Sequence, residues 1–288
     1  MLANAEPWLP DGQAGPWTGS RFHDVRYVVE TDSTNADLFV AARGGTTGPL
    51  VLVTGHQRRG RGRQDRTWYD EPGDSLLVSV LITAQRTWAD LVPLAAGLAA
   101  ERAVNRFLNS MALAAGGDLH DVVALKWPND LLVPGLDERK LAGILVESTS
   151  STVPASLAVV IGMGLNLRWS SAPPDEVRER ATTLTAVTRR LAGATLPDDV
   201  RPRLLGQYLS ALDAALTTLA GSGGRLATIA EYRGRCLTVG RSVELVTPAE
   251  EITGHAVGIG DGGELLVELS DGTVRSVTAG DAHHRPPA

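Results

Sequence analysis

The chain has 288 residues, of which 43% are hydrophobic, and a formal net charge of −6. This length suits one large domain followed by a small one, and the hydrophobic fraction allows a packed core. The acidic balance argues against general affinity for nucleic acid, because phosphate binding usually leaves a basic surface across a domain. A single cysteine, Cys236, permits no intrachain disulfide and favours a reducing, cytoplasmic location. No signal peptide or membrane span is visible, so we expect a soluble protein without a membrane partner.

The chain begins with residues 1–20, which we interpret as a flexible arm. They are too few for a three-helix DNA-binding module, so we expect no DNA partner. A strand is expected over residues 26–30 and a helix over residues 36–42. Asp32 or Ser33 can cap this helix, which is the better interpretation for an isolated sequence. The alternative is that the polar groups at the helix start also bind the polar head of a ligand.

An apolar strand over residues 50–54 leads directly into a basic segment, residues 57–68, which we call the arginine loop. It reads Gln57, Arg58, Arg59, Gly60, Arg61, Gly62, Arg63, Gln64, Asp65, Arg66, Thr67 and Trp68. Glycine lets the backbone approach a ligand closely, and guanidinium groups bind carboxylates and phosphates through paired hydrogen bonds. Such a segment should be mobile when empty and ordered by an anion. A solvated basic loop and a nucleic-acid arm are the alternatives, but the acidic net charge favours a small anionic ligand.

A strand over residues 75–83, a long helix over 88–108 and a loop over 111–119 follow. The next strand, 122–126, ends in Lys126-Trp127-Pro128-Asn129-Asp130. Proline cannot continue a regular ladder, so a turn should display the last two side chains at a strand end. This is either an ordinary turn or a place where Asp130 helps to hold Mg²⁺ near a nucleotide.

A strand over residues 140–147 opens with Lys140, and after a polar hairpin a buried strand over 157–167 contains Gly162 and Gly164. Glycines weaken a strand unless a ligand or another backbone comes close. No helix is expected directly after this Gly-x-Gly, so it does not match a dinucleotide fingerprint.

Residues 174–220 are predicted to be helical, in two or three pieces broken by Gly193, Pro197 and Pro202, with a further short helix over 226–233. Four short strands with glycine-containing turns follow, at residues 242–246, 254–259, 264–269 and 274–279. They predict a small β-barrel of about fifty residues. The adjacent His283 and His284 are expected to lie in a tail and to be incidental rather than metal ligands.

Five motifs in this order resemble the biotin–protein ligase family, in its form without an N-terminal DNA-binding domain. They are Asp32-Ser33-Thr34-Asn35, Gly60-Arg61-Gly62-Arg63 with Trp68, Lys126-Trp127-Pro128-Asn129-Asp130, Lys140-Leu141-Ala142-Gly143-Ile144-Leu145-Val146-Glu147, and Gly162-Met163-Gly164-Leu165-Asn166. The resemblance runs from about Tyr27 to the C-terminus. It implies an α+β fold: a mixed β-sheet with flanking helices over residues 21–235, of the class II aminoacyl-tRNA synthetase and biotin ligase type, and an SH3-like barrel over 236–288.

The resemblance also implies an activity. The carboxylate of biotin attacks the α-phosphate of ATP to give biotinyl-5′-AMP and pyrophosphate, and a lysine of a biotin carboxyl carrier protein domain then takes the biotin and releases AMP. ATP, Mg²⁺ and biotin are needed, and no cofactor is permanently bound. The carrier domain is the expected partner, and the enzyme itself is expected to be a monomer or a weak homodimer.

The family's functional residues carry over to matching positions here. The expected catalytic residues are Lys140, Arg61 and Arg63, and the expected metal ligand is Asp130. Biotin binding is expected from Ser33, Thr34, Asn35, Gln57, Arg61, Gly62, Arg63, Lys140, Gly143, Gly162 and Gly164. Nucleotide binding is expected from Arg63, Trp68, Asn129, Lys140 and Asn166.

Two positions depart from the family pattern: Asp65 replaces a glycine of the loop, and Gly55 stands where an acidic residue is common. Asp65 puts a carboxylate into an anion-binding loop and removes backbone freedom.

Two functions are alternatives to that of a biotin–protein ligase. A lipoate or octanoate ligase would share the fold, although the motifs speak against it. A non-catalytic arginine-loop binding module would lose affinity steeply with salt.

Overall fold

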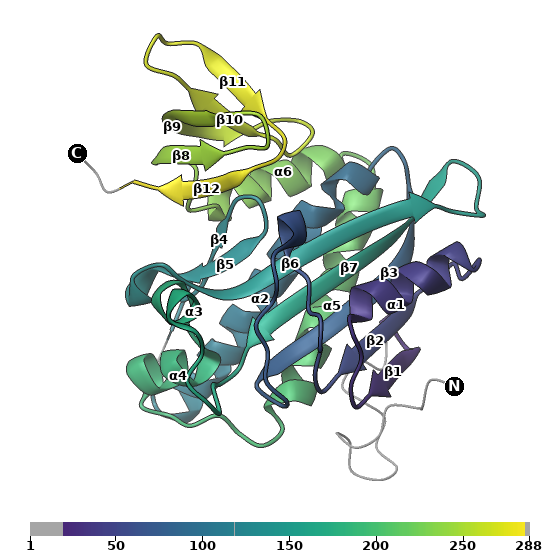
Figure 1. Ribbon diagram of the computed structural model, residues 1–288, viewed down its shortest axis with the longest axis vertical. Coiled ribbons are helices and arrows are strands. Elements are labelled where there is room, and N and C mark those ends of the chain that lie inside the picture. The colour runs from purple at the N-terminus through teal and green to yellow at the C-terminus, as the bar shows by residue number, and fades with distance from the viewer. Residues whose placement is uncertain (1–19, 118, 286–288) are drawn as a thin grey trace.

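The computed structural model describes residues 20–117 and 119–285, apart from the side chains of Asp65 and Ala192. Nearly all of the predicted N-terminal arm therefore lies outside the described residues. The described chain forms a large mixed sheet with helices and a smaller antiparallel sheet made by the C-terminal residues (Figure 1). This confirms the expected α+β class, whereas the domain boundary at residues 235 and 236 stays a prediction.

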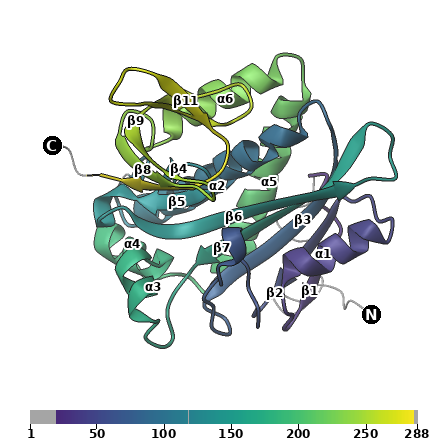
Figure 2. The same ribbon diagram turned by 45° about the horizontal axis from the view of Figure 1, so that its top comes forward.

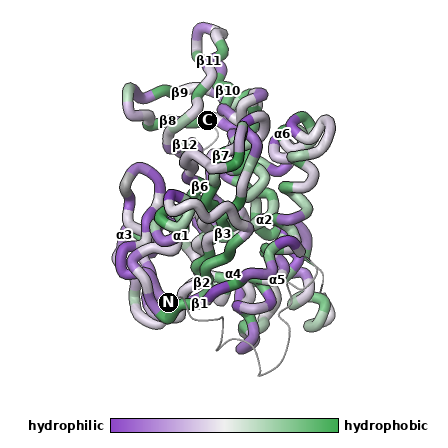
Figure 3. The backbone as a smooth tube through the Cα atoms, turned by 90° about the vertical axis from the view of Figure 1, so that its right-hand side faces the viewer, coloured by the Kyte–Doolittle hydropathy of each residue, from purple (hydrophilic) through white to green (hydrophobic). Residues whose placement is uncertain are grey.

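Seven strands form the large sheet in the order β1-β2-β3-β7-β6-β5-β4. Only the edge pair β1–β2 is parallel, and the other neighbours are antiparallel. Their bounds are β1 Val25–Val28, β2 Leu50–Thr54, β3 Ser75–Gln85, β4 Ala124–Lys126, β5 Asp130–Val133, β6 Arg139–Ser150 and β7 Ser156–Asn166. The hydrophobic central strands are visible in Figure 3.

Helices cover both faces of this sheet, and the alternation of side chains along β2 shows how. Val51 and Val53 point into the main core, where the helices α2 (Val92–Ala114), α5 (Val200–Ala220) and α6 (Gly224–Arg235) pack. Leu50 and Leu52 point the other way, beneath α1 (Thr34–Arg43). Figure 1 shows α1 in front of the sheet and α5 behind it. The short helices α3 (Asp175–Arg180) and α4 (Leu184–Ala192) lie near the start of β6.

The C-terminal sheet has the order β11-β10-β9-β8-β12 and is antiparallel throughout. Its strands are β8 Ser242–Val246, β9 Glu251–Ile259, β10 Leu265–Glu268, β11 Val274–Val277 and β12 Asp281–His284. It sits over β4, β5 and α6 (Figure 2). Trp127 links the C-terminal sheet to the large sheet. The Trp127 indole N–H donates to Gly263 O at 3.0 Å, and the Trp127 backbone N–H donates to Thr238 Oγ1 at 3.0 Å.

Several predicted boundaries were wrong. Helix α2 continues to Ala114 through the first part of the predicted loop over 111–119, because Ala112 extends its buried face. Pro202 does not break α5, since it lies in the first turn, where a missing N–H removes no helical hydrogen bond. The prediction also missed β5 and β12.

His284 does not lie in a free tail, as predicted, but in strand β12 with a buried side chain. Its Nδ1 lies 2.8 Å from Glu138 Oε2 and its Nε2 lies 3.0 Å from Thr238 Oγ1. The side chain therefore belongs to the contact between the two sheets. Within the described chain, no helix has both the length and the apolar character needed to cross a membrane.

Candidate active site

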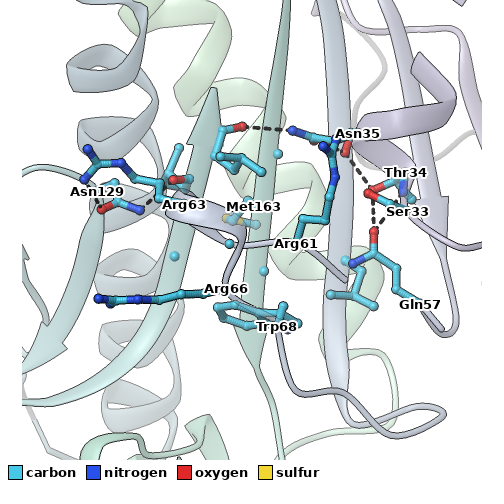
Figure 4. A pocket seen from close by; sticks show the side chains of 18 of the residues that line it. Ser33, Thr34, Asn35, Gln57, Arg61, Arg63, Arg66, Trp68, Asn129 and Met163 are labelled. Atoms are coloured by element: carbon cyan, nitrogen blue, oxygen red, sulfur yellow. Dashed lines mark hydrogen bonds between the residues drawn. The ribbon is translucent and has the colours of Figure 1, made fainter. Parts of the chain in front are cut away.

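A cavity of about 150 Å³ opens on the face of the large sheet beside α1 (Figure 4). All five sequence motifs meet there: the start of α1, the arginine loop, the turn before β5, strand β6 and strand β7. The predicted residues that line it are Ser33, Thr34, Asn35, Gln57, Arg61, Gly62, Arg63, Trp68, Asn129, Asp130, Lys140, Gly143, Gly162 and Gly164. Asn166 is the exception. It lies outside the lining, and its side-chain amide donates to Thr182 O at 3.1 Å.

The start of α1 caps the helix and also lines the cavity. Ser33 is the N-cap residue, and its hydroxyl accepts from the backbone N–H of Ala36 at 3.5 Å. Thr34 and Asn35 are buried at the cavity wall. The backbone N–H and the hydroxyl of Thr34 lie 2.8 and 3.0 Å from Gln57 Oε1. Capping thus fixes the helix while the next two side chains face the cavity.

Ser79 was missed by the sequence analysis. It is a fully buried hydroxyl in the middle of the apolar strand β3, and it lies 2.7 Å from Thr34 Oγ1 and 2.6 Å from Asn35 Oδ1. A serine in the middle of the apolar run over residues 76–82 was the available signal, because a buried hydroxyl needs a hydrogen-bond partner.

The arginine loop is folded across the cavity, and hydrogen bonds hold its two ends, near Gln57 and Trp68. Trp68 N–H donates to Gly60 O at 2.9 Å, which closes the loop on itself. Asp70 Oδ2 accepts from Gln57 N at 3.2 Å and lies 3.0 Å from His56 Nδ1. Burial is the main cause that raises the pKa of Asp70. Within Arg63–Asp65 the non-helical residue is Gln64, with φ of 54°, so the left-handed backbone falls on Gln64 and not on Asp65.

The glycines of β6 and β7 make room for protein side chains. A Cβ atom on Gly164 would lie 2.7 Å from the Trp68 ring, and one on Gly143 would lie 3.1 Å from it. A Cβ atom on Gly162 would lie 2.2 Å from Asn35 Oδ1. The sequence analysis expected a ligand or backbone at these glycines, and the structure instead brings in two side chains of the site. The buried indole nitrogen of Trp68 has no hydrogen-bond partner within the described residues.

The charged residues that line the cavity, among those that the structure describes, are four cations and two carboxylates: Arg61, Arg63, Arg66, Lys140, Asp130 and Asp281. Lys140 Nζ lies 2.8 Å from Asp130 Oδ1 and 5.5 Å from the centroid of the Trp68 ring. Arg63 donates to Asn129 Oδ1 and to Gly280 O, each at 3.3 Å, and its pKa is lowered, chiefly by burial. Burial also lowers the pKa of Lys126, and the charge of Lys140 acts in the same direction. Positive charge is therefore concentrated where an anion would sit.

The C-terminal sheet contributes directly to this site. Asp281, at the start of β12, lines the cavity and forms an ion pair with Arg66 of the arginine loop. The neighbouring Gly280 carbonyl receives the bond from Arg63. Neither residue was predicted, because nothing in the local sequence marks β12 as adjacent to the loop.

Residues 28–166 match the Biotin/lipoate A/B protein ligase family, and residues 238–285 match the Biotin protein ligase C terminal domain. The biotin–[acetyl-CoA-carboxylase] ligase of Mycobacterium tuberculosis is 36% identical over 282 residues, which covers 96% of this chain and 94% of that protein. The biotin protein ligase of Aquifex aeolicus in complex with biotin and ATP has a similar fold, with a TM-score of 0.70 and 23% identity over 92% of this chain and 99% of that one. The Leishmania major biotin protein ligase in complex with biotinyl-5-AMP has a TM-score of 0.55 and 25% identity, covering 89% of this chain and 99% of that one. The chain therefore belongs to the biotin protein ligase family.

Proposed function

We propose that the cavity binds biotin and ATP, forms biotinyl-5′-AMP, and passes the biotin to a lysine of a biotin carboxyl carrier protein domain. The observation that carries this proposal is the meeting of Lys140, the arginine loop and the polar start of α1 around one cavity. Two residues of the cavity lining support it: the Trp68 indole N–H has no hydrogen-bond partner among the described residues, and the half-buried Arg63 carries a guanidinium group suited to an anion.

The start of α1 supports biotin as the substrate. A ureido ring offers two N–H donors and one carbonyl acceptor, and Thr34, Asn35, Ser79 and Gln57 provide both kinds of partner. A dithiolane ring, as in lipoate, has neither. A site built to hydrogen-bond a polar ring favours a substrate that makes those bonds over an analogue that lacks them.

In the first step, a carboxylate oxygen of biotin forms a bond to the α-phosphorus of ATP while the bond to the pyrophosphate oxygen breaks. Two anions must meet, so positive charge has to neutralise both of them through the transition state. Lys140 is placed to do this when it exchanges its ion pair with Asp130 for the reacting oxygens. Arg63 and the loop cover the products and keep water from the mixed anhydride.

The fit of Mg²⁺ rests on Asp130 with its neighbour Asn129. Mg²⁺ usually takes one or two carboxylates together with substrate phosphates, and no group of three candidate ligands occurs among the described residues. Asp130, released from Lys140, would therefore hold the ion only together with ATP. When bound, Mg²⁺ would neutralise charge on the phosphates that leave as pyrophosphate.

In the second step, the amine of the acceptor lysine attacks the biotinyl carbonyl and AMP leaves. The carrier domain of a biotin-dependent carboxylase is the proposed partner, and the enzyme is proposed to act in the cytoplasm as a monomer or weak homodimer without binding DNA. The net charge of −6 supports the last point. Binding to operator DNA in a gel-shift assay would contradict it.

The deciding experiment measures pyrophosphate release with ATP, Mg²⁺ and either biotin or lipoate, with Lys140→Ala beside the unchanged enzyme. Release with biotin that the substitution abolishes is expected. Release with lipoate alone would keep the mechanism and change the substrate. No release with either, from folded protein, would favour a binding module and overturn the proposal.

A further inference from the structure

A continuous chain of polar contacts links two points of the arginine loop through the wall of the cavity. It begins at Gln57, where the loop starts, and ends at Arg61 in the middle of the loop. Its members, in order, are Gln57, Thr34, Ser79, Asn35, Glu147 and Arg61. We call this set the polar chain. Figure 4 shows its labelled members around the cavity.

The direction of the hydrogen bonds fixes the Asn35 amide. Ser79 donates its single hydroxyl proton to Asn35 Oδ1 at 2.6 Å and therefore accepts from Thr34. The Asn35 NH₂ group then faces the opposite way and donates to Leu145 O at 3.2 Å and to Glu147 Oε2 at 2.9 Å. Asn35 is 4% exposed, so solvent offers its amide no alternative partner.

Glu147, on β6, joins this buried amide to the loop. The Glu147 carboxylate also accepts hydrogen bonds from Arg61 Nη2, which lies 3.2 Å from Oε1 and 3.0 Å from Oε2. The side chains of Arg61 and Glu147 are 42% and 26% exposed, and an isolated pair of that kind would contribute little. Here the buried Asn35 holds the carboxylate in one place, which gives Arg61 a fixed anchor.

We propose that Glu147 is a positioning residue that couples occupancy of the cavity to closure of the arginine loop. A ligand that binds Thr34 or Asn35 stabilises the hydrogen bond from Asn35 to Glu147. Glu147 fixed in this way stabilises the ion pair with Arg61, and with it the closed loop. The ligand is biotin if the proposed function is correct, so the inference rests on that function. Linkage requires that the factor by which biotin shifts the equilibrium between the open and the closed loop equals the factor by which loop closure tightens biotin binding.

Trypsin tests this directly, because the loop contains five arginines. The measured quantity is the ratio of cleavage rates within residues 57–68 without and with biotin, read from fragment masses. We expect a ratio of about tenfold in the unchanged enzyme, which is a typical coupling. Glu147→Gln should bring the ratio close to one, and biotin affinity, measured by calorimetry, should fall by no more than the same factor.

Glu250→Gln is the matched control, because Glu250 pairs with Arg275 in the C-terminal sheet, far along the chain from the loop. It should leave the ratio unchanged. Arg61→Gln should give the same low ratio as Glu147→Gln, and the double variant should go no lower. A purely structural role would instead lower the melting temperature and leave the ratio intact.

The outcomes separate the two proposals. If biotin binds but the ratio stays high in Glu147→Gln, or is already one in the unchanged enzyme, the coupling role is wrong and the proposed function stands. If the folded enzyme does not bind biotin at all, the proposed function itself fails.

Discussion

At the residue scale, Gly162 shows why a strand of the sheet carries glycine at the cavity. Its hydrogen points at Asn35, whose amide is held from both sides by Ser79 and Glu147. A methyl group there would lie 2.2 Å from Asn35 Oδ1, and the amide has no free direction in which to move. The glycine is therefore needed for the shape of the wall, beyond any approach by a ligand.

Gly162→Ala should weaken biotin binding by about tenfold or more, because strain of this kind typically costs 1–3 kcal/mol. Calorimetric titration with biotin measures this. Gly135→Ala is the control, since a Cβ atom on Gly135 meets nothing within 4 Å. Unchanged affinity in Gly162→Ala would mean that the position of Asn35 does not matter for binding.

His284 gives the second prediction at this scale. His284 Nδ1 lies 2.8 Å from the Glu138 carboxylate, which can only accept, so the ring proton sits on Nδ1, and Nε2 lies 3.0 Å from Thr238 Oγ1. Burial is the main cause that lowers the pKa of His284, and the charges of Lys126 and Arg241 act in the same direction. The ring is therefore neutral in the folded protein at neutral pH.

The sign of the pH effect follows from this lowered pKa. As pH falls through the ordinary histidine value of 6.5, the unfolded chain takes up a proton before the folded chain does, so stability is lost on acidification. The melting temperature should drop between about pH 7.5 and about pH 5.5. His284→Gln should reduce this drop, and His255→Gln, at an exposed position of β9, should not. An equal drop in all three proteins would rule out His284 as the source.

At the element scale, the arginine loop depends on contacts outside its own sequence. Its base is held by Asp70, which accepts from the Gln57 N–H and lies 3.0 Å from His56 Nδ1. Asp70→Ala should therefore increase trypsin cleavage of the ligand-free loop by about fivefold or more, because it leaves the Gln57 N–H without its partner, at a cost of about 1 kcal/mol or more. Asp271→Ala, on a hairpin of the C-terminal sheet, is the control. A cleavage rate like that of the unchanged enzyme would mean that the base is held by other contacts.

The elements themselves differ in how far the sequence predicts them. The strands over residues 50–54 and 242–246 were predicted at their observed bounds, because each has a local hydrophobic pattern. Strand β12 has the sequence DAHH and no such pattern, and it is a strand because it pairs with β8. The site follows the same rule: motifs identified Lys140 and Arg63, whereas Ser79 and Asp281 belong to it only through tertiary contacts. Asn166 has the right motif and lies outside the lining.

At the scale of the whole molecule, the two sheets meet at the arginine loop. Trp127 is 1% exposed and fixes the C-terminal sheet through the carbonyl of Gly263. This contact brings Gly280 and Asp281 to the loop, where they bind Arg63 and Arg66. The C-terminal sheet thus completes the wall of the cavity, which predicts that it helps to close the loop.

Asp281→Asn should open the loop without unfolding either sheet. The Arg66 and Asp281 side chains are 61% and 19% exposed, so their ion pair should contribute at most about 1 kcal/mol, or about fivefold in an equilibrium. Hydrogen–deuterium exchange of residues 57–70 measures this, because Gly62 N–H and Trp68 N–H are bonded only while the loop is folded. Exchange should become up to fivefold faster in Asp281→Asn, by the same estimate, and should not change in Glu251→Gln, an exposed carboxylate at the start of β9.

Because added salt weakens an exposed pair, the difference between Asp281→Asn and the unchanged enzyme should shrink at high ionic strength. If exchange in the loop is the same in both proteins at low salt, the loop is held by the large sheet alone, and the C-terminal sheet must serve some other step.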